Sequence, residues 1–141
     1  MNTVITHAEV ADRTGTVIPA HLEAQAEVPV ATTFWRQGDL YIRKETHPIP
    51  PGATAHNLAG RGHKVVSGEA DRNSHILNGD GTFHVCHPVS RTVDYGLLVV
   101  PDGGLSVLTH TAEHGSVAFG GGMWRIWGQV SYESELRRAA D

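Results

Sequence analysis

The sequence predicts an all-β protein with a single main domain, built of hairpins as a small barrel or as a cupin-like or jelly-roll sandwich. Short segments rich in β-branched and aromatic residues recur along the chain, and turn signals separate them about every 10–20 residues. No long stretch has the 3.6-residue period of an amphipathic helix. The 141 residues suffice for one domain with its own core.

The turn signals are runs of Gly, Asn, Asp and Pro between strand-like segments. They predict three hairpins, whose turns are Asn78–Gly81, Pro101–Gly104 and Gly120–Gly122. Further strands are expected at Asp39–Lys44 and His63–Ser67. Tyr132–Ala140 is expected to form a short C-terminal helix with Ser131 as its N-cap.

Residues 1–33 differ from the rest of the chain and predict an N-terminal arm or extension before a β domain at 34–141. They are rich in Ala, Thr and Val and contain no aromatic residue. Helix-forming residues in His21–Glu27 end before Pro29. We expect such an arm to favour a homo-oligomer.

The composition excludes several classes of protein. A single cysteine, Cys86, cannot form an intrachain disulfide framework. No apolar run is long enough for a membrane span, and the N-terminus lacks the features of a secretory signal. We therefore expect a cytoplasmic protein that does not engage a membrane. The net charge of −4 gives no strong nucleic-acid signal, although residues 34–73 alone carry +2.

The last expected strand has two clearly different faces. Alternation along it places one set of side chains toward the core: Trp124, Ile126, Val130 and Tyr132. The other set is half polar, as in a cleft or an interface: Arg125, Trp127, Gln129 and Ser131. We take Arg125, Trp127 and Gln129 as candidate substrate-binding residues, since Arg125 could pair with an anionic group.

Ten histidines are the unusual feature of the composition, and the densest cluster has the spacing H-x-x-E-H. It holds His110, Glu113 and His114. On a helix this spacing is a zinc-protease motif, but Gly115 and the flanking strands do not accommodate a helix. In a turn the three side chains could bind a metal, act as an acid–base pair or simply face water.

A second cluster places Glu69 after an expected strand and His75 at the start of the next one. A buried Glu–His pair would orient an imidazole for catalysis or metal binding. A surface loop with local turn bonds explains the same residues equally well.

Four sequence blocks resemble a family of small, largely uncharacterised proteins of bacteriophages and bacteria. The blocks are Gln37–Ile42, Ser67–His75, Leu108–Gly115 and Gly122–Tyr132, within a resemblance that runs from about Arg36 to Asp141. The chain departs from the family pattern at Asp71-Arg72-Asn73, where relatives have Thr-Gly and a second His, and at Trp124 and Ser131. The resemblance implies a phage or mobile-element context. It also implies a common site for Glu69, His75, His110, Glu113 and His114.

These observations favour a His/Glu-centred, metal-dependent hydrolase. His75, His110 and His114 would be metal ligands or acid–base groups, with Glu69 or Glu113 as general base. The cofactor would be one divalent transition metal (Zn, Fe, Ni or Mn), and the substrate a small molecule. Two alternatives remain. One is a phage virion or capsid-associated assembly protein, located in the virion. The other is a cupin-like module that binds a small ligand without turnover.

Overall fold

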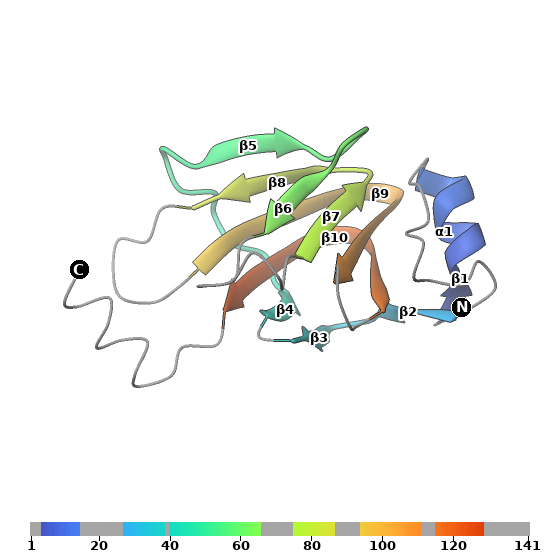
Figure 1. Cartoon of the computed structure of the whole chain (residues 1–141). Coiled ribbons are helices and arrows are strands. Elements are labelled where there is room, and N and C mark those ends of the chain that lie inside the picture. Colours follow the sequence, from blue (N-terminus) through green and yellow to red (C-terminus); the bar gives the residue numbers. More distant parts are fainter. Residues whose placement is uncertain are drawn as a thin grey trace.

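The computed structural model describes residues 4–14, 27–38, 40–65, 75–86, 94–110 and 115–128 (Figure 1). One helix and ten strands lie within these ranges. They are β1 Val4–Thr6, α1 His7–Thr14, β2 Glu27–Ala31, β3 Phe34–Gln37, β4 Leu40–Lys44, β5 Thr54–Asn57, β6 His63–Val65, β7 His75–Gly79, β8 Thr82–Val85, β9 Asp94–His110 and β10 Ser116–Gly128. The expected C-terminal helix and its cap, Ser131, lie outside the described residues.

All ten strands belong to one mixed sheet whose spine is the long antiparallel pair β9 and β10. Near the β9–β10 connection, β2 and β1 extend the sheet beyond β10, and β7 and β6 extend it beyond β9; we call this part the first half-sheet. At the other end, β4 and β3 flank β10, and β8 and β5 flank β9; this is the second half-sheet. A mostly-β protein is confirmed. The closed barrel is a wrong expectation, because the described sheet remains open.

The two last glycine-rich segments are bends within β9 and β10 and not the predicted hairpin turns (Figure 1). The pairing steps from Leu105 opposite Gly120 to Val100 opposite Gly122, which leaves Pro101–Gly104 outside the regular ladder. Glycine favours a bulge as much as a tight turn, since both use backbone conformations that Cβ disfavours. Only the long-range strand pairing distinguishes the two outcomes.

The first predicted hairpin turn, Asn78–Gly81, is a corner between two strands that do not pair with each other, so this hairpin is also a wrong expectation. Here β7 and β8 both pair with β9, one after the other along its length. The Asp80 carboxylate accepts a hydrogen bond from the Leu105 amide at 3.0 Å, and the Asp80 amide donates to the Leu105 carbonyl at 2.9 Å. The Ser106 hydroxyl donates to the Asp80 carbonyl. Asp80 thus fastens this corner to β9.

The main core lies between the two half-sheets, because each contributes inward side chains to one cluster. The cluster comprises Ala31, Leu40, Ile42, Leu58, Val65, Leu77, Phe83, Leu98, Val100, Leu108, Val117, Phe119, Trp124 and Ile126. In β10, Trp124 and Ile126 are buried, whereas Arg125 and Trp127 are partly exposed. The predicted facing of this strand is therefore confirmed for its described residues.

A second cluster packs on the other face of the first half-sheet and includes residues of the N-terminal segment. Its members are Ile5, Val10, Val28, Leu105, Val107 and Ala118. Thr6 caps α1, since its hydroxyl accepts a hydrogen bond from the Glu9 amide at 3.1 Å and lies 3.4 Å from the Glu9 carboxylate.

Within the described part of the chain, no helix is long and apolar enough to cross a membrane.

Candidate functional site

Two buried histidines meet at one end of the main core. His75 opens β7, and strand register places it directly opposite His110 at the end of β9. Both alternate with core leucines, so both side chains face the core. Their ring centroids lie 4.6 Å apart, with the ring planes at 76°, and their exposures are 0% and 4%. The structure therefore unites two of the residues that the sequence nominates.

A buried glutamine from the second half-sheet holds this pair. The side-chain amide of Gln37 donates to the carbonyls of Leu108 and Gly115, each at 3.0 Å. A carbonyl can only accept, so these bonds fix the direction of the amide. The amide oxygen then lies 2.7 Å from Nδ1 of His75 and accepts a hydrogen bond from it. Nδ1 of His75 is therefore protonated, and in the neutral ring the lone pair is on Nε2.

Gly38 covers the histidine pair from the turn after β3. Its φ is +58°, a conformation that residues with a Cβ rarely adopt. A Cβ at this position would lie 3.3 Å from Cε1 and 3.5 Å from Nε2 of His75, and 3.9 Å from Cδ2 of His110. The positive φ therefore favours glycine, and a Cβ at this position would be in tight contact with the His75 ring.

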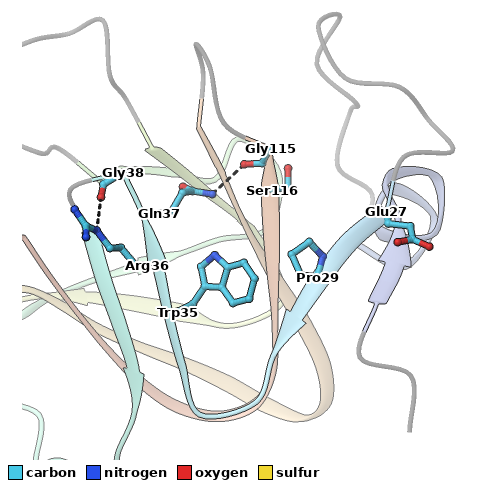
Figure 2. A pocket seen from close by; sticks show the side chains of 8 residues that line it. All are labelled: Glu27, Pro29, Trp35, Arg36, Gln37, Gly38, Gly115 and Ser116. Carbon is cyan, nitrogen blue, oxygen red and sulfur yellow. Dashed lines mark hydrogen bonds between the residues drawn. The ribbon is translucent and has the colours of Figure 1, made fainter.

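A cleft of about 670 Å³ lies beside Gln37 and Gly38 (Figure 2). Eight residues line it: Glu27, Pro29, Trp35, Arg36, Gln37, Gly38, Gly115 and Ser116. Gln37 and Gly38 contact His75 and also line the cleft, so they connect the two features. Arg36 is held by a hydrogen bond from its Nε to the Gly38 carbonyl at 3.1 Å. The volume lies in the range of small-molecule sites.

Several nominated residues fall outside the described part of the chain: Glu69, Glu113, His114 and Gln129. In the sequence, Glu113 and His114 belong to the four residues that connect His110 to Gly115. The described residues by themselves contain no group of three or more His, Cys, Asp or Glu side chains that could hold a metal.

Arg125 and Trp127, nominated as substrate-binding residues, face away from the core and thus away from the histidine pair. In their place, Trp35 and Arg36 line the cleft. Sequence reasoning misses Trp35, Gln37 and Gly38 as site residues. Gln37 and Gly38 open the Gln37–Ile42 block, but no property of the block alone indicates that β3 lies over β7 and β9, and Trp35 lies outside the block.

A separate histidine pair predicts a small pH dependence of stability. Burial, and then the neighbouring charge of His56, lower the pKa of His63 from its usual 6.5. The two rings stack at 4.2 Å. Since the unfolded state then binds more protons, this contribution to stability is lost as the pH falls below about 6.5. On acidification, we expect the unfolding temperature of His63→Asn to fall by about 1–2 °C less than that of the native protein.

Thermal unfolding followed by circular dichroism between about pH 7.5 and 5.5 measures this difference. His47→Asn is the control, since His47 is an exposed histidine away from the stacked pair. Equal pH dependence in the native protein and His63→Asn would contradict the prediction.

No curated protein and no solved structure matches the chain. Residues 36–129, about two-thirds of the sequence, match a protein family. This range contains the second half of β3 with Gln37, both histidines of the pair and all of β10. The chain therefore belongs to the family described as "Domain of unknown function (DUF8820)".

Proposed function

We propose that this protein is a metal-dependent hydrolase of small molecules, centred on His75 and His110. The observation that carries the proposal is the hydrogen bond from Nδ1 of His75 to Gln37, at 2.7 Å. It places the lone pair of the neutral imidazole on Nε2, and this held tautomer is the form that both a metal ligand and a general base require. His110 supplies a second imidazole on the adjacent strand.

The remaining catalytic groups are assigned from the sequence. We propose His114 as the third ligand and Glu113 or Glu69 as the general base. Glu113 and His114 belong to the four-residue connection between two site residues. The base would take a proton from water, whose oxygen attacks the electrophilic carbon or phosphorus, and would then give that proton to the leaving group as its bond breaks. A divalent metal (Zn, Fe, Ni or Mn) would lower the pKa of that water.

The cleft beside Gln37 and Gly38 suits a substrate with an apolar part and an anionic group. Trp35 and Pro29 supply apolar walls, and the guanidinium of Arg36 supplies a positive charge near Gly38. Arginine recognises carboxylate and phosphate groups through paired N–H donors. The sequence nominates Arg125 and Trp127 for substrate binding. We assign this role to Trp35 and Arg36 instead.

Metal content and hydrolysis by the untagged protein test the proposal. We expect about one equivalent of metal in the native protein, and at least tenfold weaker metal binding in His75→Ala and His110→Ala. His47→Ala, at an exposed histidine, is the matched control and should retain the metal. Circular dichroism verifies that each variant is folded. Phosphoesters, nucleotides and peptides form the first substrate screen.

A native protein that takes up no metal after reconstitution would contradict the proposal, as would a folded His75→Ala variant that retains its metal.

The second candidate is a phage virion or capsid-associated assembly protein. It is supported by the resemblance of the four sequence blocks and by the open sheet, since edge strands are surfaces for self-association. A stable homo-oligomer without metal or turnover would favour this second candidate.

A further inference from the structure

The outward face of the second half-sheet carries aromatic rings and guanidinium groups side by side. We define this basic–aromatic face by six residues from three strands: Phe34, Arg36, Tyr41, Arg43, Arg125 and Trp127. Each belongs to β3, β4 or β10 and alternates with inward-facing residues. Register places Arg36 opposite Tyr41, Tyr41 opposite Trp127, and Arg43 opposite Arg125.

The aromatic rings form a continuous row across the three strands. Tyr41 lies 6.2 Å from Phe34 and 5.6 Å from Trp127, between ring centroids, and it is stacked on Trp127 at 21°. Phe34 is 48% exposed, which makes it one of the two large exposed hydrophobic residues within the described part of the chain. The row ends at an aromatic surface that solvent reaches.

The guanidinium groups accompany this row. Arg36 lies 5.4 Å from the centroid of Tyr41, while Arg125 and Arg43 lie 5.4 and 5.6 Å from that of Trp127. Cation–π contacts of this kind hold a guanidinium beside a ring while leaving its N–H groups able to bind an anion. Phosphate-binding groups and base-stacking groups are thus interleaved on one face.

The charge of this face is opposite to that of the whole protein. Every charged side chain described in β3, β4 and β10 is basic, although the protein carries a net charge of −4. Glu45, just after β4, lies 3.9 Å from Arg43 and 3.8 Å from Arg125. One carboxylate at these distances neutralises only part of the charge of three arginines. The face therefore attracts polyanions locally.

We propose that the basic–aromatic face binds single-stranded DNA. Aromatic rings on a sheet stack with unpaired bases, and interleaved arginines contact the phosphates, which is the general chemistry of single-strand binding. A duplex hides the faces of its bases, so the rings favour a single strand. RNA selectivity uses contacts to the 2′-hydroxyl. The six residues of this face supply stacking and phosphate contacts, both of which single-stranded DNA offers without a 2′-hydroxyl. Arg36 also lines the cleft of the proposed hydrolase, but the variants tested below, at Phe34, Arg43 and Trp127, leave that cleft and the histidine pair unchanged.

Fluorescence anisotropy of a labelled oligothymidine, titrated with the full-length protein at about 50 mM salt, tests this proposal. We expect about tenfold weaker binding for Phe34→Ala and Trp127→Ala. Arg43→Gln should weaken binding several-fold and reduce its salt dependence. Arg61→Gln is the charge-matched control, because Arg61 is exposed and lies between β5 and β6, off this face. Its affinity should equal that of the native protein.

Phe34→Ala is the variant that tests binding without disturbing the fold, since this exposed ring belongs to neither core cluster. Affinities of all three face variants equal to that of Arg61→Gln would overturn the proposal, as would the absence of binding by the native protein. Tighter binding of duplex DNA would exclude the stacking mode. Tighter binding of oligouridine would overturn the assignment to DNA.

Discussion

Replacing Trp124 with alanine is expected to lower the unfolding temperature by about 10–20 °C, the largest effect that we expect of any single substitution. Trp124 is 1% exposed, packs on Phe119 with ring centroids 5.0 Å apart, and donates from its indole nitrogen to the Gly120 carbonyl at 3.1 Å. The substitution removes this packing between the half-sheets and leaves a cavity. Buried Trp-to-Ala changes cost about 3–5 kcal/mol in free energy of unfolding.

Trp127→Ala is the matched control for this prediction, because the same change is made three residues away on the other face of β10. Trp127 stacks on Tyr41 and is only partly buried, so we expect a loss of about 1–2 kcal/mol. Chemical denaturation followed by fluorescence or circular dichroism compares the two variants. Equal destabilisation by both substitutions would contradict the placement of the core between the half-sheets.

Gln37→Leu is expected to have the second-largest effect, about 3 kcal/mol of lost stability. Leucine has a similar size but makes none of the hydrogen bonds of Gln37 to His75, Leu108 and Gly115. The substitution leaves two buried partners, His75 and Leu108, and the exposed Gly115 carbonyl without this glutamine. Each loss at a buried partner costs about 1–3 kcal/mol before relaxation. Stability is measured by denaturant unfolding.

Thr109→Val is the comparison for the loss of one buried hydrogen bond, since the Thr109 hydroxyl lies 2.9 Å from the Ser116 hydroxyl. We expect it to cost about 1 kcal/mol. If the proposed metal site exists, Gln37→Leu should also weaken metal binding by about 10–100-fold, because the tautomer of His75 is no longer held. If the Gln37→Leu variant is at least as stable as the Thr109→Val variant, Gln37 does not connect the two half-sheets as described.

The candidate site contains residues that local sequence patterns identify and residues that they do not. The composition of their own segments makes His75 and His110 candidates, and the resemblance of the sequence blocks implies that they share a site; the structure places them opposite each other. Gln37 escapes such reasoning, because a single glutamine after a short strand has no local property that distinguishes it. Its importance comes from Leu108 and Gly115, 71 and 78 residues further along the chain.

The same distinction holds for the fold, in which some features follow from the local sequence and others only from tertiary contacts. Strand composition and alternation are sufficient to predict a mostly-β protein and the buried face of β10, because side-chain direction in a strand depends only on neighbouring residues. The bends near Pro101 and Gly120 have the local signature of hairpin turns, because glycine permits both conformations. The energies that choose between them arise from pairing with β2, β4, β7 and β8. Those contacts are distant in sequence, so they are defined only when the whole sheet assembles.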